Sequence, residues 1–460
     1  MRIKAALALG LVLGVAGCAP PLAKPDLKMV VSGYVPGAPA AAPNGVIEAS
    51  WWRIFKSPAL NALVARGLAA NPGIGEATAN LAAANENGAA TDAAFLPQVI
   101  LGNQNSPTIS RQSYPTGPNG YPPYTVYTLN GAISYDPGLF GARKYSFENG
   151  AAQAAYQAAL LAAARQSVAG NIAAAAIGLA GIQAQITVTQ RIIAAEHALL
   201  TLLQGEYQDG AITQLSVLQQ QSAMVIAEAS LPPLQAQADV LRDRLAVLSG
   251  SLPVDFSGPE VSLDALTVPA DLPVELPSAY LANRPDIRAA RAEVAAQNAA
   301  LGVAVAHLYP DISLTAQGGY ASEAVGSLFE PGAALWTLAG NLLAPIYEGG
   351  ALHDRKAQAQ AQLAAALDAY RQAVLTAFGQ AADALQAIKT GQAALDEAHE
   401  AAALSAQAFD LARAQYGLGA VDYNTVLTAQ GSAARAALNL VQARTNLLLD
   451  VATLQAAMAK

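Results

Sequence analysis

Two long stretches of the chain have the apolar spacing of an amphipathic helix and contain no proline. They cover about residues 143–204 and 351–415. At 1.5 Å per residue, about 60 residues would span roughly 90 Å, far more than the roughly 11–12 residues of an average globular helix. In the second stretch the apolar residues recur every three or four positions, close to the 3.6-residue helical period: Leu363, Leu367, Tyr370, Val374, Phe378, Ala381, Leu385 and Ile388.

Four shorter stretches do not follow the helical period. Apolar and polar residues alternate at 125–135, 312–317 and 336–342, and the pattern at 97–106 is looser. A two-residue period predicts a strand with one apolar face. Each stretch approaches the roughly 9–11 residues that a tilted strand needs to cross a membrane. The four strands are expected to pair as two hairpins, one before each long helix.

One segment of the sequence is repeated. YQDGAITQLSVLQQQ (207–221) and YGLGAVDYNTVLTAQ (416–430) share Tyr, Gly, Ala, Val, Leu and Gln at the same six places. Tyr207 and Tyr416 are 209 residues apart, and so are Tyr127 and Trp336. Solenoid repeats are shorter, roughly 20–50 residues, so this offset indicates a duplicated unit. Each copy joins a long helix to a returning helix, at 212–249 and 421–458, and Gly210 and Gly419 stand where a helix ends in a left-handed conformation.

These patterns divide the chain into five parts. Residues 1–17 form a signal peptide, and 18–94 form an extended segment followed by helices at about 58–70 and 75–94. Residues 95–250 are the first repeat, a β-hairpin plus a long helical hairpin. A Pro-rich equatorial linker, 251–280, leads into the second repeat, 281–460, whose first helix starts at Pro285.

The N-terminus has the pattern of a secretory signal. Arg2 and Lys4 precede an apolar run that is too short for a spanning helix, and VAGC follows. This ending resembles a bacterial lipoprotein signal, in which Cys18 is lipidated, for example with palmitate, and becomes the mature N-terminus. An ordinary signal peptide cut nearby is the alternative. Ala19 in place of Asp favours sorting to the outer membrane.

Composition excludes several other functions. The chain is 53% hydrophobic but only 6% aromatic, with net charge −8, which argues against a nucleic-acid surface. With a single cysteine it has no internal disulfide. The four histidines are scattered, and DEAHE (396–400) is interpreted as a solvated helix face. No phosphate loop, nucleophile elbow or dinucleotide motif occurs, so we expect neither an enzyme nor a cofactor nor a metal site.

Three motifs carry a resemblance to a known family: WWRIFKSPALNALVARGLAANP, LANRPDIRAARAEVAAQNAALGVAVAHLYPDISL, and the Tyr-x-x-Gly hairpin with Val-Leu-x-Ala-Gln. Each resembles a motif of the outer membrane efflux proteins, the TolC-like outer membrane factors, and the lipoprotein branch fits best. The resemblance covers nearly all of the mature chain. It implies an α+β membrane protein, a homotrimer with four strands per chain in one 12-stranded barrel. A long periplasmic helical barrel, an adaptor (membrane fusion) protein and an inner-membrane pump would complete the export path.

Physical chemistry agrees with this assembly. A lone four-stranded sheet in lipid would leave unpaired edges, which a bilayer does not tolerate. The mature segment closest to a spanning helix is SVAGNIAAAAIGLAGI (167–182), which is mostly Ala and carries Asn171. The strands, rather than helices, are therefore expected to cross the membrane.

The repeated turns are the candidate periplasmic gate or adaptor contact. The residues are Tyr207, Asp209, Gly210, Tyr416, Gly419 and Asp422. In a trimer the acidic pair would form carboxylate rings that favour cations; solvated turn residues are the alternative. In the family's closed channels an Arg and two Asp hold the mouth shut. Val421, Thr425 and Thr428 occupy those positions here, so that ionic latch is not carried over.

Three functions remain open from sequence. The first is a passive trimeric export duct for drugs or other small toxic compounds. The second is an outer membrane channel for type I protein secretion, which would have a similar tunnel. The third, from a different class, is a lipid-anchored periplasmic coiled-coil scaffold, which would contain no strands.

Overall fold

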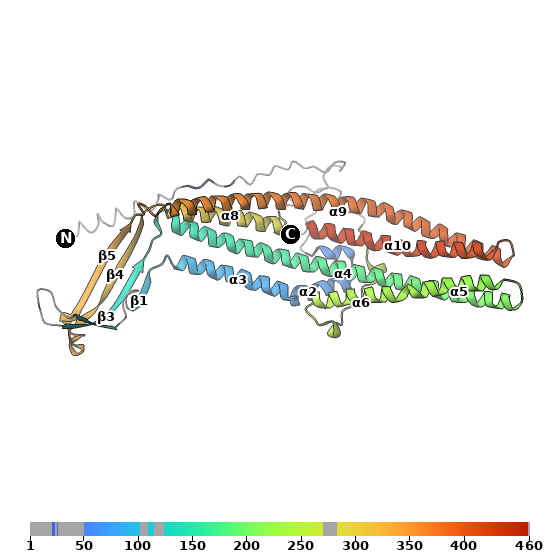
Figure 1. Cartoon of the computed structure of the whole chain (residues 1–460), viewed down its shortest axis with the longest axis horizontal. Coiled ribbons are helices and arrows are strands. Elements are labelled where there is room, and N and C mark those ends of the chain that lie inside the picture. The colour runs from blue at the N-terminus through green and yellow to red at the C-terminus, as the bar shows by residue number, and fades with distance from the viewer. Residues whose placement is uncertain are drawn as a thin grey trace. The chain divides into compact units, whose positions relative to one another are not determined.

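The computed structural model describes residues 21–23, 25, 50–101, 109–114, 124–269 and 283–458. Cys18, the predicted signal peptide, most of the extended segment and part of the linker lie outside the described residues. The chain divides into two compact units, each containing segments distant in sequence. Figure 1 labels the helices and strands and colours them by residue number along the chain. Among the described residues, unit 1 contains 21–23, 25, 79–101, 109–114, 124–158 and 289–372, and unit 2 contains 50–78, 159–269, 283–288 and 373–458.

Unit 1 contains an antiparallel sheet. The strands are β1 (Gln98–Leu101), β2 (Ile109–Tyr114), β3 (Tyr124–Tyr135), β4 (Asp311–Ser322) and β5 (Ala334–Leu343). Their order is β1-β3-β4-β5, and β2 also pairs with β3. β2 pairs with the first half of β3 and β1 with its second half, so both lie along the same side of β3. The strands predicted at 125–135, 312–317 and 336–342 are confirmed, and each is longer than predicted.

The two faces of this sheet differ in polarity. Val99, Ile133, Ala316 and Leu338 lie opposite one another across the sheet, and Val99 and Leu338 are 75% and 72% exposed. The positions on the other face are mostly polar: Gln98, Asn130, Ser134, Ser313, Thr315, Gln317, Thr337 and Asn341. Alternation of this kind suits a strand with lipid on one side and a polar interior on the other.

The two long helices match the predicted repeat. α4 (Ala142–Gln208) and α9 (Ala351–Gly417) each have 67 residues, and their first residues are 209 positions apart. Each runs through both units. The returning helix of the second repeat is also confirmed, as α10 (Tyr423–Met458).

The returning helix of the first repeat differs from its prediction. Instead of one helix over 212–249 there are two, α5 (Gln214–Ala229) and α6 (Leu231–Leu248), with Ser230 between them. Pro232 and Pro233 occupy the first turn of α6, where their missing N–H groups are tolerated. Inside a continuous helix each proline would remove a hydrogen bond and clash with the preceding turn.

The remaining elements are shorter. α2 (Pro58–Ala70) starts at Ser57, whose Oγ accepts a hydrogen bond from the N–H of Leu60 at 3.3 Å. α3 (Pro72–Ala93) follows, and α8 (Pro285–Ala306) begins at the predicted proline. Short 3-10 helices complete the described chain: η1 (Trp51–Phe55), η3 (Leu139–Gly141), η4 (Pro253–Asp255), η5 (Leu263–Ala265), η6 (Val325–Ser327) and η7 (Pro331–Ala333).

The core of unit 2 explains the high alanine content. Buried residues of α4 include Ala169, Ile172, Ala173, Ala176 and Ile177, a stripe of mostly small side chains that lets neighbouring helices approach closely. One described helical stretch, Leu139–Gln208, is long and apolar enough to span a bilayer by length and composition alone. The buried stripe lies within it, so its apolar residues serve packing inside the protein.

Candidate functional site

The first helical hairpin reverses through a hydrogen-bonded turn built on Gly210. Its N–H donates to the carbonyl of Tyr207 at 3.0 Å, and the next N–H, of Ala211, donates to the carbonyl of Glu206 at 2.8 Å. This pair of bonds closes a helix when the glycine is left-handed. The φ angle of Gly210 is 74°.

The second hairpin has the same turn. The N–H of Gly419 donates to the carbonyl of Tyr416 at 2.9 Å, and that of Ala420 to the carbonyl of Gln415 at 2.9 Å. Gly419 has a φ of 71°. The prediction that both glycines are left-handed is confirmed, and the repeated sequence forms one turn twice.

The helices that follow the two turns start differently. Asp422 precedes α10, and its Oδ1 accepts hydrogen bonds from the backbone N–H and the hydroxyl of Thr425, at 2.9 and 2.6 Å. Thr213 occupies the corresponding position before α5. Its side chain caps no backbone N–H and lies 3.4 Å from the hydroxyl of Ser216. Only the second hairpin therefore has a charged helix cap.

A tyrosine joins the two hairpins near the turns. The hydroxyl of Tyr416, on α9, donates to Glu206 Oε2, on α4, at 2.6 Å. The ring of Tyr416 also meets the ring of Tyr423 edge to face, with centroids 6.3 Å apart and planes at 67°. Tyr416 therefore contacts α4 of the first hairpin through its hydroxyl and α10 of its own hairpin through its ring.

A second, buried chain of hydrogen bonds runs beside the first. The hydroxyl of Tyr423 donates to Gln220 Oε1, and Gln220 Nε2 donates to Glu196, to its carbonyl oxygen at 2.9 Å and to its carboxylate. Gln220 is fully buried, and Tyr423 and Glu196 are each 6% exposed. Buried polar groups are costly unless paired, so this chain fixes α4, α5 and α10 in one arrangement.

Burial changes the acid–base behaviour of this cluster. It raises the pKa of Glu196, and the hydrogen bond from Gln220 opposes that shift. Burial and the neighbouring Glu206 raise the pKa of Tyr416 to about 12. The pKa of Tyr423 is raised for similar reasons, by burial and by the charge of Glu196. Both tyrosines therefore remain protonated donors throughout the physiological range.

The predicted acidic residues lie at the turns but do not contact each other in the described structure. Asp422 is exposed, and its hydrogen bonds to Thr425 lower its pKa. Asp209 is exposed, and its backbone N–H donates to the carbonyl of Gly205 at 3.0 Å. Tyr207 is 45% exposed. The carboxylate ring and the adaptor contact remain predictions.

The three positions that match the latch of the resembling family form no hydrogen bond or ion pair to the other hairpin among the described side chains. Val421 is half-buried, and Thr425 and Thr428 are exposed. The hydroxyl of Thr425 donates to Asp422, and that of Thr428 to the carbonyl of Asn424 at 2.8 Å, within their own helix.

Sequence reasoning missed Glu196, Glu206, Gln220 and Tyr423. Tyr423 and Gln220 lie inside the two repeated segments, but neither is conserved between the copies. The only available signal was the occurrence of carboxylates on an otherwise Ala-rich helix close to the turn. Their partners lie up to about two hundred residues away in sequence, so the pairing depends on how the hairpins pack.

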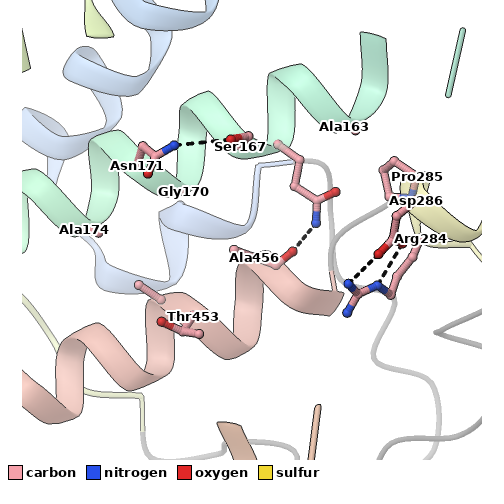
Figure 2. A pocket seen from close by; sticks show the side chains of 12 residues that line it. Ala163, Ser167, Gly170, Asn171, Ala174, Arg284, Pro285, Asp286, Thr453 and Ala456 are labelled. Atoms are coloured by element: carbon pink, nitrogen blue, oxygen red, sulfur yellow. Dashed lines mark hydrogen bonds and ion pairs between the residues drawn. The ribbon is translucent and has the colours of Figure 1, made fainter. Parts of the chain in front are cut away.

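A separate pocket in unit 2 is lined in part by Arg284, Pro285 and Asp286 of the LANRPD motif (Figure 2). Arg284 donates to both carboxylate oxygens of Asp286, at 3.0 and 2.7 Å, to Gln380 Oε1 at 2.8 Å and to the carbonyl of Ala457 at 3.2 Å. Its side chain is 9% exposed. All three guanidinium nitrogens therefore donate hydrogen bonds within the protein. These bonds hold the start of α8 against α9 and α10, so the motif has a structural role rather than that of a ligand site.

Comparison with known protein families identifies the family of this chain. The family model described as outer membrane efflux protein matches residues 63–251 and 276–460. The chain belongs to the outer membrane efflux protein family. Relatives in this family include the pyoverdine export outer membrane protein OpmQ of Pseudomonas aeruginosa. It is 32% identical over 394 residues, which cover 83% of this chain and 80% of that protein.

Other members and solved structures agree. The toluene efflux pump outer membrane protein TtgF of Pseudomonas putida is 28% identical over 386 residues, 83% of this chain and 79% of that protein. The outer-membrane channel OprN superposes with a TM-score of 0.87 at 25% identity, covering 96% of this chain and 98% of that one. The outer membrane protein VceC of Vibrio cholerae, at 24% identity and a TM-score of 0.81 over 90% and 99% of the two chains, shows the same fold.

Membership establishes the class of function. The protein is an outer membrane efflux channel subunit, a transport protein of a family that does not consist of enzymes. Within the described residues no group of three His, Cys, Asp or Glu side chains could hold a metal ion. The strands of unit 1 contradict the alternative of a strand-free coiled-coil scaffold.

Proposed function

We propose that three copies of this chain form a passive export duct for small toxic molecules across the outer membrane and periplasm. The observation that carries the proposal is the sheet of unit 1, with one exposed apolar face and one polar face. Its outer strands, β5 on one side and β1 with β2 on the other, each have an edge that pairs with no other strand of the described residues. In lipid such edges must pair, and the edges of neighbouring copies would close a barrel.

The cargo class is proposed from the relatives. Their names give pyoverdine, toluene, solvents and antibiotics as exported compounds, all small molecules. Type I protein secretion remains the second candidate, and no feature of the described structure favours it.

The repeated turns are the proposed periplasmic mouth. Three copies would present six similar turns, which offer quasi-equivalent sites to the hairpins of a periplasmic adaptor, itself linked to an inner-membrane pump. In the absence of the family's ionic latch, we assign closure to the contacts between the hairpins. These are Tyr416 with Glu206, and Tyr423 through Gln220 to Glu196.

Lipidation of Cys18 is proposed as an additional anchor, from the VAGC sequence after a charged apolar leader. Mass spectrometry of the mature protein should find an acylated Cys18 at the N-terminus. An unmodified terminus at another residue would exclude the lipoprotein. Because a barrel is itself a membrane anchor, Cys18→Ser is expected to leave the channel in the outer membrane.

The membrane assignment is tested with neighbouring residues on opposite faces of β5. Leu338→Arg places a charge on the apolar face and should hinder insertion by about 2–4 kcal/mol near the bilayer midplane. Thr337→Arg, one residue earlier on the polar face, is the matched control and should assemble. Outer membrane fractions of cells expressing each variant are compared. Equal assembly of both variants would remove the lipid-facing assignment.

Transport itself is tested in a host that lacks its own outer membrane channel. Expression of this chain with its genomic adaptor and pump should lower accumulation of a fluorescent drug, and Leu338→Arg should abolish the effect. Unchanged drug accumulation together with secretion of a protein substrate would favour the second candidate.

The carboxylate ring is tested by Asp209→Asn together with Asp422→Asn. Asparagine caps helices about as well as aspartate, so the double substitution removes charge while retaining the cap of α10. Bilayer recordings should show weaker cation preference. Unchanged selectivity would show that these carboxylates are only solvated turn residues.

A further inference from the structure

The apolar face of the sheet in unit 1 consists of rows of cross-strand neighbours. One row contains Val99, Ile133, Ala316 and Leu338. The rows on either side are also apolar or aromatic, and their members include Leu129, Tyr320, Trp336, Leu314, Ile312 and Leu342. On β4 these rows extend over residues 312–320, about as long as the roughly 9–11 residues that a tilted strand needs to cross a membrane.

The rows beyond the aromatic ones are polar. Arg111 on β2 lies opposite Tyr127 on β3, and Tyr127 lies opposite Ser322 on β4. One row further, the hydroxyls of Ser113 and Thr125 lie 3.3 Å apart. Both rows lie where β3 begins and β4 ends, and the chain continues into α4 from the other end of β3. With the helices in the periplasm, as proposed, the polar rows lie at the outer surface of the membrane.

Arg111 gives this end of the sheet a positive charge. Among the described sheet residues, no other side chain on the apolar face is charged, and the one acidic residue, Asp311, is on the polar face at the opposite end. Arg111 is exposed and forms no hydrogen bond or ion pair with another described side chain. The protein described here therefore leaves this guanidinium without a counter-charge.

The neighbouring aromatic residues locate the level of the membrane surface. The ring of Tyr320 meets the ring of Phe329 edge to face, with centroids 5.4 Å apart and planes at 65°. Trp336 is 80% exposed. Tyrosine and tryptophan are enriched at membrane–water interfaces. Arg111 lies one row beyond Tyr320, so its side chain is at the level of the lipid headgroups, where a lipid-facing arginine is tolerated far better than at the bilayer midplane.

We propose that Arg111 and Tyr127 bind a phosphate group of an outer-leaflet lipid, the phosphorylated glycolipid of this membrane. Directly opposed residues of an antiparallel pair have Cβ atoms about 4.5–5.5 Å apart, so one phosphate can accept hydrogen bonds from both side chains. A guanidinium matches phosphate with two parallel N–H···O bonds. The inference rests on the proposed function for the lipid-facing side of the sheet.

The apolar rows distinguish a lipid from a free anion as the ligand. A phosphate from solution would interact only with the polar row. The acyl chains of a lipid held by Arg111 would also cover the exposed side chains of Trp336 and Leu338 in the rows towards the membrane centre. Burial of apolar surface adds to the affinity, so we expect phosphate and acyl chains to be recognised together.

Native mass spectrometry of the full-length protein, purified from outer membranes in mild detergent, tests the site. The probes are diphosphoryl lipid A, dephosphorylated lipid A and inorganic phosphate. Arg111→Gln should bind diphosphoryl lipid A about tenfold more weakly than the wild type, because charge-assisted hydrogen bonds are lost. Arg111→Lys should lie between the two, since it keeps the charge but not the planar fork.

A variant with unchanged net charge is the matched control. Arg111→Gln combined with Gln112→Arg moves the charge by one residue, to the polar face of the same strand. It should bind diphosphoryl lipid A as weakly as Arg111→Gln alone. Wild-type binding by this double variant would show general electrostatic attraction rather than a site, and would overturn the proposal.

The remaining outcomes separate this inference from the proposed function. If Arg111→Gln assembles and binds lipid A like the wild type, the lipid site is wrong and the duct stands. Equal binding of dephosphorylated lipid A would also overturn the site, and so would inorganic phosphate binding as tight as that of lipid A. If Leu338→Arg assembles as well as Thr337→Arg, the sheet does not face lipid, and the site and the duct fail together.

Discussion

The first and second helical hairpins have the same turn and different surroundings. Gly210 and Gly419 adopt nearly the same φ, and the hydrogen bonds around them match. After the turn the hairpins diverge: the first returns through α5 and α6, broken at Ser230, and the second through the unbroken α10. The comparison shows that a few local residues specify the reversal, while the helices that follow the two turns differ.

Substitution of the turn glycines, which the two hairpins share, should reduce drug export more than any other change. Gly419→Val and Gly210→Val each place a β-branched residue at a positive φ, which costs about 1–3 kcal/mol. Because an added Cβ would meet nothing within 4 Å at either site, the strain is confined to the backbone of the turn. Both variants should reach the outer membrane as oligomers but fail to lower drug accumulation.

Gly417→Ala is the control for the glycine variants. It lies two residues before Gly419, at the helical end of α9, also with open space around it, and should be tolerated. Normal efflux and normal adaptor cross-linking by Gly419→Val would show that the turn is not a docking site.

Substitutions at equivalent positions of the two hairpins should differ in their effect on thermal stability. Tyr423→Phe removes the hydroxyl bound to buried Gln220 and leaves that amide oxygen without its donor, at a cost of about 1–3 kcal/mol. Gln214, the first-repeat counterpart, is exposed, so Gln214→Ala should change stability by less than about 0.5 kcal/mol. Thermal melts followed by circular dichroism in detergent measure both. Equal melting temperatures for the two variants would contradict the asymmetry.

Much of this comparison could be predicted from sequence. The alternation of apolar residues located β3, β4 and β5, and the repeat located both left-handed glycines, because these features depend on nearby residues. The single helix predicted over 212–249 was wrong because Pro232 and Pro233 start a new helix. The contacts of Glu196, Glu206 and Gln220 could not be predicted, since they depend on the packing of helices that are distant in sequence.

A pH dependence should follow from Glu196. Burial raises its pKa above the ordinary value of 4.5, so the folded protein holds this proton more tightly than the unfolded chain. Protonated Glu196 therefore stabilises the folded protein fully below the ordinary pKa, and this stabilisation is lost as pH rises through the raised pKa. Glu196→Gln should flatten this decline in melting temperature. An unchanged pH profile would show that Glu196 is not the group responsible.

The smallest effect concerns the helix caps. Asp422→Ala should lower the melting temperature because Asp422 Oδ1 caps α10. Thr213→Ala should lower it less, since the Thr213 side chain caps no backbone N–H. Hydrogen bonds lower the pKa of Asp422 in the folded protein. The charged side chain therefore stabilises the folded protein above its ordinary pKa, and this stabilisation is lost as pH falls through the lowered pKa. Melting temperatures of both variants are measured above and below this pH range. Equal decreases in melting temperature for the two variants would contradict the difference between the caps.

We propose that contacts between the two hairpins of each chain hold the mouth of an outer membrane duct closed. Single-channel recording in planar bilayers of Tyr416→Phe combined with Tyr423→Phe tests it most directly, because both hydroxyls that cross between the hairpins are removed. Tyr370→Phe, distant on α9, is the control. The double variant should conduct more than the wild type while the control does not. Wild-type conductance in a double variant that still assembles would contradict the claim.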